Sequence, residues 1–277
     1  MGIFNNYTKA GPGVPKVAPK KSRFTTFFEI FFRKFWKLIQ INLLYLAFCI
    51  PVVTIGPATA GLVKVLRNYS QEKNAFIWGD FFETFKKEFK RSFVIGLIDI
   101  AIIVLLYFCA QVYPTLAATN KVFILPFILS LSLGLVIMMM HFYIYLLIVS
   151  VDLSFKDTIK NAFILTFAGM KSNILTLLFS AILVVGTVAL SLFVSPLFSL
   201  LFIVILVATI WLIICFNSYP VIQKFVINPY YEEKGEESPE FAYLKPITDN
   251  ETVFTDKGGT ELPIKPQPKE KRGKIIS

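Results

Sequence analysis

The stretch from Val122 to Ser150, VFILPFILSLSLGLVIMMMHFYIYLLIVS, decides the fold class of this chain. It contains no Asp, Glu, Lys or Arg, and as a helix it is long enough to cross a hydrocarbon layer of about 30 Å. A segment that is apolar on every side over this length is typical of a membrane span. The stretch therefore predicts a transmembrane helix.

Other apolar stretches extend this pattern along the chain. Three of them are about as long as a span, namely 92–113, 173–194 and 197–219. The stretch 38–66 is also nearly uncharged, but Pro51 and Pro57 interrupt it, and proline disfavours one continuous helix. We expect two shorter spans here, joined by a turn in which Thr54 satisfies a carbonyl that the prolines leave free. The prediction is an all-α polytopic transmembrane bundle of about six spans.

The composition is typical of a membrane protein, and the distribution of the basic residues indicates what they bind. Of the 277 residues, 55% are hydrophobic and 17% are charged, and the formal net charge is +10. The basic residues are divided among the connections between apolar stretches instead of lying on one soluble domain. We therefore expect anionic lipid headgroups of the bilayer as partners, and no nucleic acid.

The distribution of Lys and Arg predicts the orientation of the spans. All but one of the 28 Lys and Arg residues fall at the two ends or in alternate connections, and the exception is Lys121. Because basic connections stay on the cytoplasmic side, this predicts a multi-pass protein of the cell membrane with both termini in the cytoplasm. A five-span arrangement is the alternative, but it would place the basic segment after Lys64 outside.

Two segments carry phenylalanine at helical intervals beside basic residues. The first covers 24–37 and the second 76–91. Helices of this kind lie in the membrane interface, with the aromatic face among acyl chains and the basic face at the headgroups. We expect both to be amphipathic interfacial helices.

The chain divides into three parts by composition. Residues 1–23 are polar, basic and rich in Pro and Gly, and are expected to be flexible. Residues 24–222 form the transmembrane helical domain. Residues 223–277 are rich in Pro, Glu and Lys and are expected to be a cytoplasmic tail of low order.

Two ionisable side chains at membrane depth are the main candidates for a functional site. Asp99 lies about two turns into the third predicted span, and His141 about two to three turns before the end of the fourth. Antiparallel helices bring such positions to similar depth. The pair could relay protons or gate a cavity, or could simply join two helices by a polar contact.

Motifs for catalysis and for metal binding are missing from the sequence. Cys49, Cys109 and Cys215 lie in apolar stretches and form no CxxC pair, and the single histidine excludes an imidazole-rich site. There is no HExxH, P-loop or GxSxG motif. We expect no enzymatic activity, no metal and no cofactor.

The first hairpin carries a motif that resembles a known family. The run NLLYLAFCIPVVTIGPATA begins at Asn42, and the aromatic, basic segment DFFETFKKEF begins at Asp80. Both are similar to segments of the YesL-like family of bacterial integral membrane proteins. The hairpin residues that carry the resemblance are Asn42, Pro51, Thr54, Gly56, Pro57 and Ala58.

The resemblance implies an accessory or regulatory role beside a carbohydrate uptake system, with a carbohydrate transporter complex as the partner. It supplies no catalytic residues. Two alternatives stay open: the chain itself moves a small solute through a cavity near Asp99 and His141, or it is a structural protein whose interfacial helices organise lipid.

Overall fold

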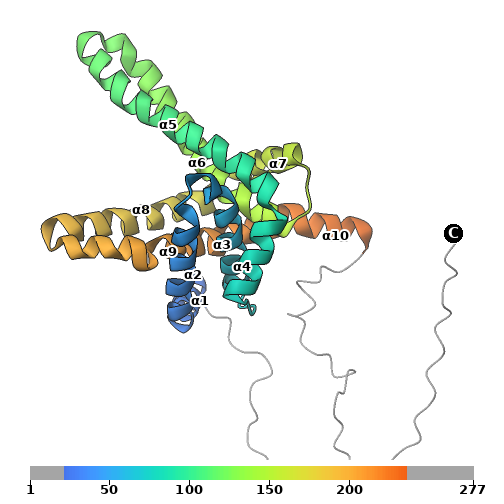
Figure 1. Ribbon diagram of the computed structural model, residues 1–277. Helices are drawn as coiled ribbons and strands as arrows, with labels where there is room; N and C mark the ends of the chain where they lie inside the picture. Colours follow the sequence, from blue (N-terminus) through green and yellow to red (C-terminus); the bar gives the residue numbers. More distant parts are fainter. Residues whose placement is uncertain (1–21, 236–277) are drawn as a thin grey trace, which may run out of the picture.

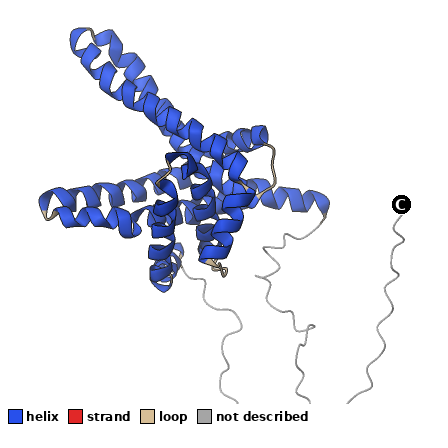
Figure 2. Cartoon of the chain, in the orientation of Figure 1, coloured by secondary structure: helices blue, strands red, loops and turns tan. Residues whose placement is uncertain are grey.

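The computed structural model describes residues 22–235, and within this part every regular element is helical (Figures 1 and 2). This confirms the predicted all-α fold. The α-helices are α1 Arg23–Arg33, α2 Phe35–Cys49, α3 Ile55–Ser70, α4 Ile77–Lys87, α5 Phe89–Thr119, α6 Ile124–Ser150, α7 Phe155–Ala168, α8 Met170–Phe193, α9 Val207–Ile222 and α10 Asn228–Lys234.

Two long hairpins dominate the shape of the molecule. The α5–α6 hairpin and the α8–α9 hairpin leave a common centre in different directions (Figure 1). Their helices supply the four segments that are long and apolar enough to cross a membrane: Phe89–Thr119, Lys121–Ser150, Met170–Phe193 and Pro196–Lys234. Length and composition together indicate a membrane protein.

Short polar caps fix the points where both hairpins turn. Asn120 follows α5, and its side chain accepts a hydrogen bond from the backbone N–H of Val122 at 3.0 Å. Ser195 follows α8 and accepts in the same way from Leu197 at 3.3 Å. These caps satisfy N–H groups at the start of the next helical segment, where no intrahelical partner exists.

Helix α3 forms the centre of the fold. It contacts α2, α4, α5, α6 and α9, and its side chains Leu62, Val63 and Leu66 are completely buried. It is short, with 16 residues, and α2 has 15. At 1.5 Å per residue each spans only about 22–24 Å, less than the roughly 30 Å of a hydrocarbon core. The structure thus has four long apolar segments and a short central hairpin, α2–α3, at the place where two shorter spans were predicted.

Helix α9 ends at Ile222, the last residue of the predicted transmembrane domain, and the chain stays helical beyond it. After α9, residues Gln223–Ile227 continue as a π-helical segment into α10, which ends at Lys234. The rest of the predicted low-order tail, and residues 1–21 of the predicted flexible N-terminal segment, lie outside the described residues.

Helix α1 has two aromatic faces with different surroundings. Phe27 and Phe31 pack against the core, and the ring of Phe27 lies 5.5 Å from that of Phe216 in α9. The opposite face leaves large side chains exposed at intervals of four residues: Phe24, Phe28, Phe32 and, in α2, Trp36. The predicted amphipathic helix is thus present, and its outer face is exposed.

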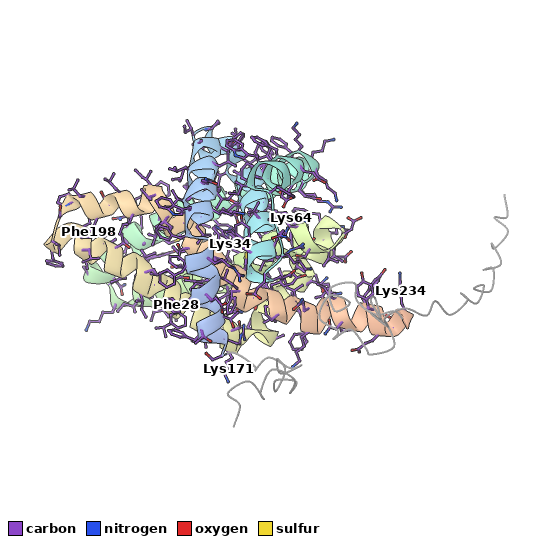
Figure 3. The ribbon with its side chains drawn as sticks, turned by 90° about the horizontal axis from the view of Figure 1, so that it is seen from below. Phe28, Lys34, Lys64, Lys171, Phe198 and Lys234 are labelled. Carbon is purple, nitrogen blue, oxygen red and sulfur yellow. The ribbon has the colours of Figure 1, made fainter. Side chains whose placement is uncertain are left out.

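The basic side chains gather away from the tip of the α8–α9 hairpin. Figure 3 shows Phe198 at that tip, while Lys34, Lys64 and Lys171 lie around the centre and Lys234 lies beyond it at the opposite end. This separation matches the uneven charge distribution in the sequence.

Candidate functional site

The structure brings Asp99 and His141 together, with Tyr145 as a third member. The Nδ1 atom of His141 lies 3.3 Å from an Oδ2 atom of Asp99, and the hydroxyl of Tyr145 donates a hydrogen bond to the same oxygen at 3.1 Å. The side chains of Asp99 and His141 are 19% and 30% exposed, whereas Tyr145 is 1% exposed. The carboxylate is therefore held by two partners in a site that is only partly closed.

Helical spacing explains how this cluster forms. His141 and Tyr145 are one turn apart on α6 and so face the same way toward α5, which carries Asp99. Trp211 of α9 closes the cluster, with its ring 5.6 Å from His141 and 5.9 Å from Tyr145. The cluster thus lies where α5, α6 and α9 meet, close to the point from which the two long hairpins diverge (Figure 1).

Beside the cluster, α3 and α5 cross at a pair of glycines. A Cβ atom at Gly56 would lie 2.0 Å from the carbonyl oxygen of Ser92, and one at Gly96 would lie 2.8 Å from the Cα atom of Gly56. Only glycine permits this approach of the two backbones. The crossing also sets the position of Tyr145, whose hydroxyl is 3.9 Å from the place of a Gly96 Cβ.

The turn before α3 contains hydrogen bonds to carbonyl groups near its prolines. The hydroxyl of Thr54 donates to the carbonyls of Phe48 and Pro51, as predicted from the sequence. Pro51 is exposed at the turn, whereas Pro57 and Ala58 are buried in the first turn of α3. Pro57 is tolerated here because the first N–H groups of a helix have no intrahelical partner.

Asn42 of α2 inserts its side chain into the backbone of the last long helix. Its Nδ2 donates to the carbonyl of Ile203 at 2.6 Å, and its Oδ1 accepts from the N–H of Ala208 at 2.7 Å. These two backbone groups are five residues apart: Ile203 lies within the π-helical segment Phe202–Leu206, and Ala208 lies just after it in α9. Asn42 is fully buried, so its amide replaces the i to i−5 bond that a π-helix would make there.

Arg67 joins three helices near the other end of α3 and was not singled out from the sequence. Its guanidinium donates to the carbonyl of Val149 and to the hydroxyl of Ser150, each at 3.0 Å. It also lies 5.5 Å from the centre of the Tyr219 ring in α9. Arg67 is only 8% exposed. The charge pattern counted it among the residues of an exposed basic connection, but in the structure it stabilises the packing of α3, α6 and α9.

Tyr69, two residues further along α3, is also buried, and its ring centre lies 5.2 Å from the ammonium of Lys34. Burial, with a contribution from the charge of Asp80, raises the pKa of Tyr69 to about 12. A tyrosine is already protonated at neutral pH, and this shift keeps the phenol a hydrogen-bond donor to higher pH.

The chemistry available in the Asp99 cluster is proton exchange or polar contact. The carboxylate of Asp99 and the imidazole of His141 are close enough for a polar contact or for the exchange of a proton. Among the described residues, no group of three or more His, Cys, Asp or Glu side chains has a geometry that could hold a metal ion. The sequence could not identify Tyr145 and Trp211, because an aromatic residue in an apolar stretch carries no sign of its partner.

Comparison with known proteins identifies one part of the chain. Residues 38–109 match the model of a family described as "Protein of unknown function, DUF624", which covers roughly a quarter of the 277 residues. No curated protein and no solved structure matches the chain. The matched part contains Asn42, the α2–α3 turn, both crossing glycines and Asp99, but not His141 or Tyr145.

Proposed function

We propose that the chain is a non-enzymatic accessory subunit of the cell membrane, with both termini in the cytoplasm, that acts beside a carbohydrate transporter. The carbohydrate part of this proposal rests on the resemblance of the Asn42 run and the Asp80 segment to the YesL-like family. The orientation rests on the position of Lys121 as the one basic residue outside the cytoplasmic connections.

One structural observation supports an accessory role over independent transport. In the most apolar windows of α5, α6 and α8, only 11%, 6% and 17% of the residues are buried within the chain. Transporters usually surround their substrate site with mutually packed spans. Here the two hairpins diverge and leave their surfaces to lipid or to the helices of another membrane protein.

Crosslinking from these surfaces tests the accessory role. A photoreactive amino acid at Leu105 of α5 or at Leu129 of α6 replaces a side chain that is 62% or 59% exposed. In cells that take up polysaccharide, we expect an adduct with a membrane subunit of a carbohydrate importer. The same group at Leu146 of α6, which is fully buried, is the control and should react only within the chain.

Two results would contradict the accessory role. Adducts with lipid alone at both exposed positions would show that no protein covers these surfaces. Unchanged carbohydrate uptake in a deletion strain would show that the chain is not required beside the transporter.

A second candidate function is transport of a small solute by the chain itself. The observation that favours it is the partly exposed Asp99, held by His141 and Tyr145 at the meeting point of three helices. Purified protein in liposomes should then show saturable flux of a sugar that falls in the Asp99→Asn variant. Absence of flux across a panel of sugars would rule against this candidate and leave the accessory role untouched.

A further inference from the structure

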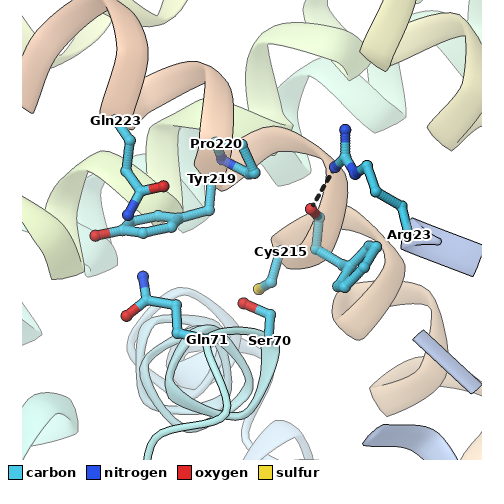
Figure 4. A pocket seen from close by; sticks show the side chains of 8 residues that line it. Arg23, Ser70, Gln71, Cys215, Tyr219, Pro220 and Gln223 are labelled. Carbon is cyan, nitrogen blue, oxygen red and sulfur yellow. Dashed lines mark hydrogen bonds between the residues drawn. The ribbon is translucent and has the colours of Figure 1, made fainter. Parts of the chain in front are cut away.

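A cavity of about 160 Å³ opens between the start of α1, the end of α3 and the second half of α9 (Figure 4). It is separate from the Asp99 cluster, and its polar lining includes Arg23, Gln71 and Gln223. At roughly 30 Å³ per water molecule, it has room for about five water-sized groups. The cavity is thus large enough for a small polar molecule.

Gln71 carries the strongest sign of a missing partner. Both its amide nitrogen and its amide oxygen are buried, and neither has a hydrogen-bond partner in the described part of the chain. Figure 4 shows this amide pointing across the cavity toward Tyr219. A buried polar atom without a partner costs about 1–3 kcal/mol, so a fully unpaired buried amide calls for a bound group.

The two free atoms of Gln71 define the ligand. Whichever way the amide is turned, it requires one donor and one acceptor from its partner. The doubly charged phosphate group of a phosphate monoester supplies acceptors only, whereas a hydroxyl group supplies both.

The charge of the lining adds a second requirement. Among the described residues that line the cavity, Arg23 carries the one formal charge, and there is no carboxylate. The guanidinium of Arg23 donates to the carbonyl of Phe216 at 3.2 Å, and a guanidinium has five N–H donors in total. An anionic group at the mouth of the cavity would be bound by the remaining donors, as phosphate commonly is by arginine.

We propose that this cavity binds a phosphorylated polyol, with the phosphate at Arg23 and hydroxyl groups at the amide of Gln71. Both a glycerophospholipid headgroup and a free polyol phosphate have this chemistry. Phe24 follows Arg23 directly in α1, and Phe28 lies one turn beyond Phe24; both rings are exposed. Acyl chains of a bound lipid would find an apolar surface there.

The test measures thermal stability of the full-length protein in lipid nanodiscs. One arm compares phosphatidylglycerol with phosphatidylcholine. A second arm adds glycerol 3-phosphate, inorganic phosphate or glycerol to protein in phosphatidylcholine. A rise in Tm with phosphatidylglycerol assigns the site to lipid, and a rise with glycerol 3-phosphate assigns it to the free compound; inorganic phosphate and glycerol alone should have little effect.

Variants separate this site from general attraction to anionic surfaces. Gln71→Leu should weaken ligand binding about tenfold through the loss of two hydrogen bonds. Without ligand its Tm should be equal to or above that of the wild type, because an apolar side chain removes the unpaired amide. Arg23→Gln, at an exposed residue, should also weaken ligand binding. Lys37→Gln removes the same charge from an exposed position of α2 and should leave ligand binding unchanged.

Three outcomes would overturn the proposal. The first is the absence of any Tm rise in both arms, which would leave the cavity to water. The second is an equal rise with inorganic phosphate, which would exclude the polyol. The third is a rise of the same size in wild type, Gln71→Leu and Arg23→Gln, which would place the binding elsewhere on the basic surface.

Discussion

The central helices and the two long hairpins have similar apolar side chains but opposite surroundings. Around α3, residues such as Ala58, Leu62 and Leu66 are completely buried by other helices of the chain. In the hairpins, the most apolar windows of α5 and α6 are only 11% and 6% buried. Apolar composition alone therefore does not reveal whether a helix packs within its own chain or is covered by lipid or a partner.

Polar contacts follow the same division. The long-range contacts of Asn42, Arg67 and Asp99 all join central segments of different helices. The hydroxyls of Ser130, Ser132 and Thr187 in the hairpins bond to carbonyls of their own helix. The centre is thus specified by directional bonds, whereas each hairpin mainly satisfies its polar groups locally, as a helix in lipid must.

The largest effect on stability should come from a methyl group added where α3 and α5 cross. In Gly56→Ala the new Cβ would lie 2.0 Å from the Ser92 carbonyl, which forces the backbones apart and should lower the free energy of unfolding by about 3 kcal/mol. Gly186→Ala in α8 is the control, because no atom of the described residues lies within 4 Å of the position of its new Cβ. This variant should be neutral or stabilising. Unfolding in detergent measures both. Equal stability of the two variants would show that the crossing is not tight.

A matched pair of leucines on one helix tests the comparison directly. Leu146→Ala removes a fully buried side chain of α6 and should cost about 2.5 kcal/mol through the cavity it leaves. Leu129→Ala removes one that is 59% exposed, and the unfolding free energy in detergent should change by less than about 0.5 kcal/mol. A large loss for Leu129→Ala would mean that a second copy of the chain already covers the hairpin.

Removing the amide of Asn42 should have a somewhat smaller effect. Asn42→Leu leaves the carbonyl of Ile203 and the N–H of Ala208 without their partner, at a cost of about 2 kcal/mol. Gln40→Leu, two residues away on the exposed side of α2, is the control and should be nearly neutral. Thermal unfolding distinguishes them. If Asn42→Leu were neutral, the last helix would have closed its own bonds across the π-helical segment.

The sequence predicted the positions of the long helices better than it predicted how the helices pack against one another. The charge-free run 122–150 and the phenylalanine spacing of 24–37 are local patterns, and the helices they predicted are present. The two proline residues in the apolar run 38–66 predicted two shorter helices there, but the burial of α3 was not evident, because it depends on the other helices that pack around it. A hydropathy pattern cannot distinguish lipid from protein as the surrounding medium.

The candidate site shows the same limit at the level of single residues. Asp99 and His141 were identified because an ionisable group in an apolar helix is expensive without a partner. The hydroxyl of Thr54 was likewise expected to form a hydrogen bond, and Asn42 was singled out by the family resemblance. The hydrogen bond from Tyr145 to Asp99, the ring contact of Trp211 with His141 and the contacts of Arg67 were missed, because each joins residues more than 40 positions apart in the chain.

The smallest effect should come from the hydroxyl of Tyr145. Tyr145→Phe removes its hydrogen bond to Asp99 but keeps the ring against Trp211, and His141 still holds the carboxylate. The unfolding free energy in detergent should therefore fall by only about 1 kcal/mol. Tyr107→Phe, on the exposed side of α5 at 62% exposure, is the matched control and should not change it. A loss as large as that of Gly56→Ala would show that the carboxylate depends on Tyr145 and that His141 does not hold it. An unchanged free energy of unfolding would show that His141 alone is enough to hold Asp99 and that the hydroxyl of Tyr145 does not stabilise the centre.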